Sequence, residues 1–215
     1  MGAAMSRFTL LLGGDLIVTP RLRAQIAGTR VVAADSGLLH AAPLKIAPEL
    51  WVGDFDSAEP EWLDAYEDME RVVYSSDKDN TDGEIAIHEA LKRGATSLVL
   101  AGAFGGPRTD HAFLHLALAI QLAERGVPAL LTSGTQEGSV VAHGGREYDY
   151  APGTTFSILG FSELRGLTVE GAKWPLDDVV VPFGSSLTIS NVVKSELVVR
   201  LREGRALLVA TLAAT

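Results

Sequence analysis

Short apolar runs alternate with longer stretches of helical periodicity through the first 132 residues, and this alternation restricts the fold more than any other feature. Alternating strands and helices build a parallel sheet with helices packed on its faces. We therefore predict a doubly wound, mostly parallel, Rossmann-like α/β unit. The expected strands lie near residues 8–12, 31–34, 50–52, 72–74, 98–101 and 129–131, and the clearest helices near 81–93 and 110–125.

The second half of the chain has a different pattern. Glycines interrupt the alternation near 133–139, which indicates two domains, 1–134 and 135–215. Beyond that point, short apolar runs are separated by glycine, proline and polar residues, as in antiparallel strands. We predict a C-terminal antiparallel β-sandwich, with a tight hairpin turn at Glu203 and Gly204. The expected strands lie near 154–159, 164–169, 186–190, 197–201 and 206–211.

Composition argues against several classes of function. The 215-residue chain has no cysteine, which excludes disulfides, thiolate zinc sites and cysteine nucleophiles. Its net charge of −9 disfavours nucleic-acid binding, because a polyanion is attracted to a basic surface. No apolar run approaches the roughly 20 residues of a membrane span, and the N-terminal residues do not resemble a secretory signal. We expect a cytoplasmic protein that binds small molecules, with no nucleic-acid or membrane partner.

Two aspartates follow the third expected strand. Asp54 and Asp56 are two positions apart, and in an extended backbone that spacing points both side chains the same way. Two carboxylates held together need a cation. Mg²⁺ prefers oxygen ligands and commonly takes one or two carboxylates together with the phosphates of a substrate. The pair therefore predicts magnesium-dependent phosphate chemistry.

A second acidic segment precedes the helix expected to follow it. Thr81 and Glu84 have the spacing of a capping box. This spacing places Asp82 in the first turn, where the helix dipole stabilises an ionised carboxylate. Asp82 is explained equally well as a dipole partner or as a metal ligand, and its neighbours Asp77 and Asp79 favour a site.

Glycine-rich or polar loops follow four of the expected strands. Gly14 follows the first strand, Asp35 the second and the aspartate pair the third, while a loop with Gly105 and Gly106 precedes a helix. Free amide groups at a helix start attract anions, and Arg108 adds a charge-assisted donor for a phosphate oxygen. Because the carboxyl ends of parallel strands share one edge of a sheet, we predict one composite site there.

Three further groups leave alternatives open. His111 and His115 have the spacing of a metal pair but lack a third ligand, so we expect His115 to pack and His111 to bond locally. No G-x-S-x-G nucleophile elbow occurs, which leaves hydrolysis a weak alternative. Trp174 is either an exposed platform for a cationic ring or a core residue, and the residues alone favour the core.

Five short segments stand in order along the chain: Gly53–Ser57, Asp77–Asp82, Gly105–His111, Gly171–Trp174 and Ser190–Asn191. Together they resemble the successive signatures of the thiamine pyrophosphokinase family, over nearly the whole chain. Each segment is short, and their order and spacing carry the resemblance. It implies an N-terminal α/β catalytic domain, a C-terminal β-sandwich, and a homodimer whose active site lies between subunits.

The resemblance also implies an activity and roles for individual residues. The hydroxyl group of thiamine attacks the β-phosphorus of ATP, diphosphate is transferred, AMP is released, and Mg²⁺ spans the phosphates. Asp54, Asp56 and Asp82 are then the catalytic and metal-binding carboxylates, and Trp174 stacks on the thiamine rings instead of packing in the core. The other assigned residues are Gly14, Asp35, Asp79, Gly105, Gly106, Arg108 and Asp110 for ATP and its phosphates, and Ser190 and Asn191 for thiamine.

Departures from the family pattern bear on the site. Ser36 stands where a second glycine is frequent, Thr109 where an apolar residue often separates arginine from aspartate, and residues 83–86 lack a lysine seen in some members. The missing lysine removes one phosphate contact. Two other functions stay open: diphosphate transfer to another small heterocyclic alcohol such as a pterin, and binding of a nucleotide or thiamine without catalysis.

Overall fold

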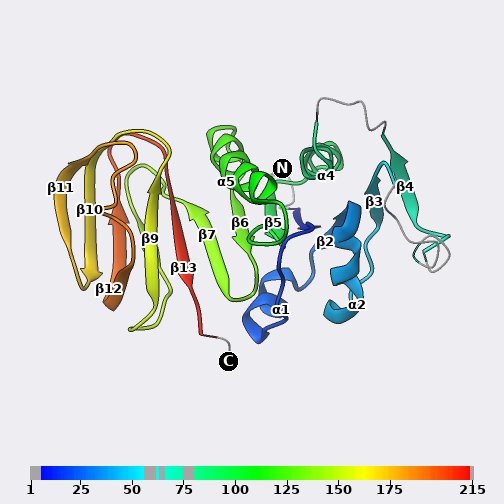
Figure 1. The fold of residues 1–215 in the computed structure, drawn as a ribbon, viewed down its shortest axis with the longest axis horizontal. Helices are drawn as coiled ribbons and strands as arrows, with labels where there is room; N and C mark the ends of the chain where they lie inside the picture. The colour runs from blue at the N-terminus through cyan, green and yellow to red at the C-terminus, as the bar shows by residue number, and fades with distance from the viewer. Residues whose placement is uncertain (1–5, 56–61, 63–65, 75–79, 214–215) are drawn as a thin grey trace, which may run out of the picture.

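The structure of the protein is a computed structural model, and it describes residues 6–55, 62, 66–74 and 80–213. Figure 1 shows an elongated molecule with helices and strands together at one end and strands alone at the other. The fold class is the predicted one, a mostly parallel α/β region followed by antiparallel strands. Within the described ranges, no helix is long and apolar enough to cross a membrane.

Six of the described strands form a parallel sheet in the order β6-β5-β1-β2-β3-β4. Successive side chains of a strand point to opposite faces, and here both faces are buried. Phe8 and Leu10 of β1 belong to one apolar core, and Leu11 belongs to another. The bounds are β1 Arg7–Leu11, β2 Arg30–Ala34, β3 Leu50–Gly53, β4 Glu70–Val73, β5 Ser97–Ala101 and β6 Ala129–Thr132.

Helices cover both faces of this sheet, which makes it doubly wound. On one face, α4 and α5 contribute Ile85 and Leu118 to the core; on the other, α1 and α2 contribute Leu22 and Leu44. The bounds are α1 Pro20–Ile26, α2 Ala41–Leu44, α4 Asp82–Lys92 and α5 Thr109–Glu124, with a 3₁₀ segment, η1, at Asp35–His40.

The winding of the sheet reverses at β1. The chain moves outward from β1 through β2, β3 and β4, and then returns to add β5 and β6 on the other side of β1. Main-chain hydrogen bonds extend the pairing past the strand ends, with Leu12 N donating to Ala101 O at 2.8 Å and Gly14 N to Gly102 O at 3.0 Å. In open α/β sheets, a reversal of this kind leaves a ligand-binding crevice at the carboxyl ends of the strands.

The sheet continues beyond β6 without a break. β7 (Gln136–Val140) pairs antiparallel with β6, and β13 (Ala206–Thr211) pairs with both β7 and β9 (Thr155–Gly160). β7 is not among the predicted strands, because Gly138 interrupts its apolar run. A Cβ atom on Gly138 would lie 3.0 Å from the Phe104 ring, which gives a packing reason for glycine. The division at 134–135 stays a prediction, with β7 following it directly in the same sheet.

The C-terminal strands surround a second core in two layers, as Figure 1 shows. β12 (Asn191–Arg200) begins beside β9 and continues beside β8 and β10, so it passes from one layer to the other. Phe156, Leu197 and Leu208 are buried between the layers. The remaining bounds are β8 Arg146–Tyr148, β10 Leu164–Ala172 and β11 Leu176–Val181.

Two local predictions for this half are wrong. Residues 186–190 form a turn instead of a strand, and Leu187 and Ile189 in it are exposed. Glu203 and Gly204 do not close a hairpin, because β12 and β13 both pair with β9 and not with each other. The positive φ expected of Gly204 is present, at 113°, but it serves a turn between the two layers.

A buried carboxylate joins α1 to β7. Glu137 is 3% exposed and accepts hydrogen bonds from Arg21 Nε at 2.5 Å, Arg21 Nη2 at 3.1 Å and Gln25 Nε2 at 2.5 Å. Arg21 also donates to Asp149 O at 3.3 Å, and its guanidinium lies 5.6 Å from the centre of the Tyr150 ring. These contacts fix the α1 face of the parallel sheet against the chain leading into the antiparallel region.

Candidate active site

A cavity of about 150 Å³ lies at the carboxyl ends of β1, β2 and β5, in the crevice where the winding reverses. Its walls come from the loops after these strands, the start of α4 and the first turns of α5. The structure thus brings together five residues of the predicted composite site. The lining residues are Leu12, Gly13, Gly14, Ala34, Asp35, Ser36, Asp82, Gly83, Gly105, Pro107, Arg108, His111, Ala112 and His115.

Glycines let the loops of the crevice approach one another closely. A Cβ atom on Gly14 would overlap the carbonyl oxygen of Gly102, and one on Gly105 would overlap the carboxylate of Asp15. Gly105 also has a φ of 64°, a value that side chains disfavour. Gly106 lies against Gly14 but does not line the cavity. The wall at this point is therefore main chain, which a ligand can approach without meeting a side chain.

The capping box predicted at the start of α4 is present. Glu84 N donates to Thr81 Oγ1 at 3.3 Å, and Thr81 N donates to Glu84 Oε2 at 2.8 Å. Asp82 is the first residue of the helix and lies in the cavity wall. The Asp82 carboxylate therefore lies both in the first turn of α4 and in the wall of the cavity.

Asp35 and Asp54 follow the neighbouring strands β2 and β3. Asp35 has a φ of 45°, a left-handed value that costs energy for a residue with a side chain. Trp51 Nε1 donates to Asp35 O at 3.0 Å, and a Cβ atom on Gly53 would lie 3.6 Å from Asp35 Cα. The end of β3 therefore packs directly on the Asp35 turn. Asp54 follows Gly53 and is partly exposed, but it does not line the cavity.

The described carboxylates do not form a closed metal cage. Within the described part of the chain, no three acidic or histidine side chains are grouped closely enough to hold a metal ion. Asp56 and Asp79, two of the predicted site residues, lie outside the described residues. Asp35 and Asp82 nevertheless supply oxygen donors in one cavity wall. This donor set fits Mg²⁺ shared between protein carboxylates and the phosphates of a substrate.

Arg108 and Asp110 form an exposed ion pair at the start of α5. Arg108 donates from Nε to Asp110 Oδ1 at 3.1 Å and from Nη2 to Asp110 Oδ2 at 2.7 Å. Hydrogen bonding from Arg108 lowers the pKa of Asp110 to about 2. Arg108 lines the cavity and Asp110 does not. The carboxylate therefore orients a guanidinium that stands at the cavity rim.

His115 packs inside the protein, as predicted. Its Nδ1 donates to Ala103 O at 3.2 Å, which ties α5 to the loop after β5. Burial lowers the pKa of His115, and the charge of His111 lowers it as well. His115 is thus held as a neutral imidazole in a buried part of the cavity wall, while His111 is partly exposed in the same wall.

A second cavity, of about 370 Å³, adjoins the first at Gly105. Apolar side chains after β1 and β5 form one part of it, and polar groups after β6 form the other. Ser133, Thr135 and Gln136 are these polar residues, and they are not among the residues predicted for the site, although they too follow an expected strand. The lining residues are Asp15, Leu16, Ile17, Phe104, Gly105, Ser133, Thr135 and Gln136.

Trp174, Ser190 and Asn191 lie together in the antiparallel region. Trp174 N donates to Asn191 Oδ1 at 3.1 Å, and Asn191 Nδ2 donates to Trp174 O at 2.8 Å. The Trp174 side chain is 53% exposed, which corrects the core position that the residues alone favour. Lys173 Nζ lies 4.3 Å from the centre of its ring. Ser190 has a φ of 61°, and its N donates to Ser157 Oγ at 3.0 Å.

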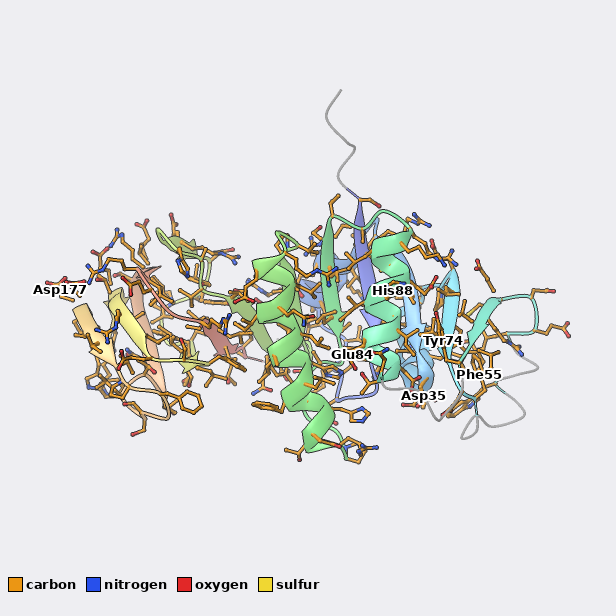
Figure 2. All side chains as sticks on the ribbon, turned by 90° about the horizontal axis from the view of Figure 1, so that it is seen from above. Asp35, Phe55, Tyr74, Glu84, His88 and Asp177 are labelled. Atoms are coloured by element: carbon orange, nitrogen blue, oxygen red, sulfur yellow. The ribbon has the colours of Figure 1, made fainter. Side chains whose placement is uncertain are left out.

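The Trp174 region is remote from the cavity within one chain. In Figure 2, Asp35 and Glu84 lie toward one end of the molecule and Asp177 of β11 lies at the other. Trp174 connects β10 to β11, and these strands end the sheet opposite β2 and β3. A single copy therefore does not place Trp174, Ser190 and Asn191 beside Asp82 and Arg108.

Comparisons with known proteins agree over most of the chain. The family model described as "Thiamin pyrophosphokinase, catalytic domain" matches residues 26–131, and "Thiamin pyrophosphokinase, vitamin B1 binding domain" matches residues 146–206. A thiamine pyrophosphokinase of Bacillus subtilis is 27% identical over 194 residues, which cover 87% of this chain and 89% of that protein.

Solved structures of similar proteins share the fold. The thiamine pyrophosphokinase of Bacillus subtilis superposes with a TM-score of 0.84 at 21% identity, covering 97% of this chain and 100% of that one. The protein of Geobacillus thermodenitrificans gives 0.79 at 25% identity, covering 98% and 99%. The protein of Candida albicans gives 0.79 at 16% identity, covering 97% and 90%.

Proposed function

This chain belongs to the thiamin pyrophosphokinase family, a family of diphosphotransferases, and from that premise we propose that it transfers diphosphate from magnesium-bound ATP to thiamine. The oxygen of the thiamine hydroxyl forms a bond to the β-phosphorus of ATP. The bond from that phosphorus to the oxygen bridging to the α-phosphate breaks, the hydroxyl proton is released, and AMP leaves. The observation that carries this proposal is the cavity that joins Asp35, Asp82 and Arg108 at the reversal of the sheet.

The cavity is suited to polyphosphate in two ways. Its glycine wall leaves the main chain open to phosphate oxygens. Its rim holds Arg108, a planar cation that pairs with phosphate by charge-assisted hydrogen bonds. Gly106 and Asp110 support these groups from outside the cavity, Gly106 by packing on Gly14 and Asp110 by orienting the guanidinium.

Carboxylates beside a polyphosphate need a cation between them. We assign Asp54, Asp56 and Asp82 as the carboxylates that hold Mg²⁺, with Asp35 and Asp79 nearby. When bound, Mg²⁺ neutralises phosphate charge and orients the group that is transferred. The protein's own contribution is to hold the reacting atoms in line and to exclude water, and in phosphoryl transfer such positioning and electrostatics supply most of the rate enhancement.

We assign the thiamine end of the site to Trp174, Ser190 and Asn191. The exposed indole offers a face to the cationic thiazolium ring. Lys173 already lies over the Trp174 ring, so thiamine takes the opposite face or displaces the ammonium. The reciprocal hydrogen bonds with Asn191 hold the Trp174 main chain in place.

The remoteness of Trp174 from Asp82 in one chain supports a homodimer with shared active sites. In such a dimer, the catalytic unit 1–134 of one subunit meets the thiamine-binding unit 135–215 of its partner. Large apolar side chains are exposed in the segment between β11 and β12 that leads into Asn191, including Phe183 at 72%, Leu187 at 58% and Ile189 at 44%. Exposed apolar groups of this size are typical of a surface that another chain covers.

The decisive assay measures AMP and thiamine diphosphate by chromatography after incubation with ATP and Mg²⁺. AMP is expected only when thiamine is present, in equal amount to thiamine diphosphate, and it should disappear when EDTA removes the metal. A panel of other alcohols, including a hydroxymethyl pterin, tests the alternative acceptor. Folded protein that binds ATP in calorimetry but releases no AMP with any of these alcohols would show a binding module instead of an enzyme.

A further inference from the structure

A large cavity lined by described residues has no role in the proposed reaction. Its volume is about 800 Å³, within the range of small-molecule sites. It lies between the last turns of α5 and the ends of β7 and β13. The cavity that joins Asp35, Asp82 and Arg108, called the phosphate cavity from here on, adjoins the first turns of α5. A helix of 16 residues spans about 24 Å, so α5 holds the two cavities apart.

The walls of this large cavity are mainly apolar. Ile120 and Ala123 of α5 face it from one side, and Val140, Val141 and Ala206 line it from the strands. Val141 and Ala206 are fully buried and belong to the C-terminal core, while Ile120 belongs to the core of the parallel sheet. The cavity therefore lies at the junction of the two cores, where an apolar ligand would contact both.

The charged groups of the cavity carry an excess of positive charge. Glu124 and Arg205 neutralise each other, because Arg205 Nε donates to Glu124 Oε1 at 2.5 Å. Arg146 also lines the cavity, and no carboxylate among the described residues forms an ion pair with it.

The Arg146 guanidinium is held in place by neutral groups. Its Nη1 donates to the hydroxyl of buried Ser139 at 3.3 Å, and the guanidinium lies 4.9 Å from the centre of the Tyr148 ring. In a chain of net charge −9, a positioned arginine without a carboxylate partner is available to an external anion. His143 stands at the same rim, with Nε2 donating to Gly204 O at 3.1 Å.

We propose that this cavity is a second ligand site, which binds a small amphipathic anion. The ligand has a compact apolar body, which fills the space beside Ala123 and Val141, and one carboxylate, sulfonate or phosphate group, which pairs with Arg146. The site is separate from the phosphate cavity and does not depend on the proposed reaction. Its ligand belongs to a chemical class that neither ATP nor thiamine represents, because ATP is a polyanion with a polar ribose and thiamine is a cation.

Two fluorescent probes test the proposal on the full chain. Anilinonaphthalene sulfonate has an apolar ring system and one anionic group, and phenylnaphthylamine has similar rings without the charge. We expect saturable binding of one anilinonaphthalene sulfonate per chain, unchanged by saturating ATP and Mg²⁺. Arg146→Gln should weaken that binding about tenfold, the value of one charged hydrogen-bonding group, and leave phenylnaphthylamine binding unchanged.

Matched variants locate the probe. Ala123→Trp should fill the cavity and abolish binding of both probes, whereas Gln121→Trp, on the same helix but outside this cavity, should leave both intact. Arg202→Gln controls for loss of an exposed arginine that pairs with Asp178. If Ala123→Trp does not fold, the comparison of the binding of the two probes to Arg146→Gln tests the proposal by itself. Any of three results would overturn the proposal. Saturable binding could be absent, the sulfonate could bind Arg146→Gln and the unsubstituted chain with equal affinity, or folded Ala123→Trp could retain binding.

Discussion

The phosphate cavity and the Trp174 surface are built in contrasting ways. The cavity is made by four segments of one chain, and packing inside that chain determines each wall: glycines at Gly14 and Gly105, a capping box at α4, and buried His115 on α5. The Trp174 surface has a rigid main chain, held by Asn191, but its large side chains face outward. The cavity lies within a single copy, and the Trp174 side chain is exposed on the surface of that copy.

Both regions place non-glycine residues in the left-handed conformation. Asp35 and Phe55 have φ values of 45° and 60° beside the cavity, and Asp178 and Ser190 have values of 47° and 61° near Trp174. Such values cost energy and persist where the surrounding structure holds them. In the first region, β3 packs on the strained Asp35 turn; in the second, Ser190 ends the exposed turn before β12, and Asp178 lies at an exposed position inside β11. Strain inside one chain therefore accompanies the cavity, whereas the strained residues near Trp174 lie at exposed positions.

The largest effect should come from the cavity. Asp82→Asn removes the charge but keeps the size of the side chain, and the Thr81–Glu84 cap remains to start α4. We expect AMP formation to fall by about 100-fold or more, because an electrostatic contact at the transferred group is lost. Glu147→Gln, at an exposed position on β8, is the control. Activity of Asp82→Asn close to that of the control would remove Asp82 from the proposed site.

The next largest effect should distinguish the cavity from the Trp174 surface, because the two are assigned to different substrates. Trp174→Ala should raise KM for thiamine about tenfold, since a desolvated cation–π contact is lost, and should leave KM for ATP unchanged. An equal rise for both substrates would contradict the assignment of Trp174 to thiamine.

Mixing variants tests whether the two regions meet across a dimer. A site shared between subunits takes Asp82 from one chain and Trp174 from the other. Because Trp174→Ala is expected to raise only KM, the assay uses a thiamine concentration well below KM. Refolding Asp82→Asn together with Trp174→Ala in equal amounts should then restore about a quarter of the normal activity, because half of random dimers are mixed and each has one intact site. Analytical ultracentrifugation of each variant controls for assembly. No gain over the separate variants would show that each chain works alone.

A smaller effect is expected at the Glu137 contact, which joins α1 to β7. Arg21→Met leaves the Glu137 carboxylate buried without its bidentate partner. We expect the free energy of unfolding in urea to fall by about 2 kcal/mol, less than for a fully buried pair because Arg21 is 44% exposed. Arg165→Met, which breaks the exposed pair with Glu163, should change stability by about 0.5 kcal/mol or less. Equal effects of the two substitutions would show that burial of Glu137 has no energetic importance.

The smallest expected effect is a pH dependence of the free energy of unfolding, which arises from His115 in the wall of the cavity. The pKa of His115 is lower in the folded chain than its ordinary value of 6.5, so the unfolded chain binds the proton first as the pH falls. The free energy of unfolding should therefore decrease as the pH drops below about 6.5, and this part of the decrease should stop once the folded-state pKa is passed. His115→Gln should reduce the slope of stability against pH in this range. Identical slopes would assign the dependence to other groups.

Local patterns predicted much of the cavity and less of the antiparallel region. The capping box at Thr81 and the polar loops after β1, β2 and β5 are signals within a few residues, and a parallel sheet brings its strand ends to one edge. β7 was missed because Gly138 lies against the Phe104 ring, a contact between residues far apart in sequence. Residues 186–190 alternate like a strand, yet they form a turn whose apolar side chains are exposed.

The sequence by itself determined the doubly wound sheet, the edge where polar loops gather and the helix that begins at Asp82, because each follows from periodicity or from short-range hydrogen bonding. Only the tertiary structure decided that Asp35, Asp82 and Arg108 share one cavity, that Asp110 orients Arg108 from outside it, and that Trp174 faces outward at the far end of the sheet. The physical reason is that side-chain exposure and loop contact depend on how distant segments pack, and local sequence carries little of that information.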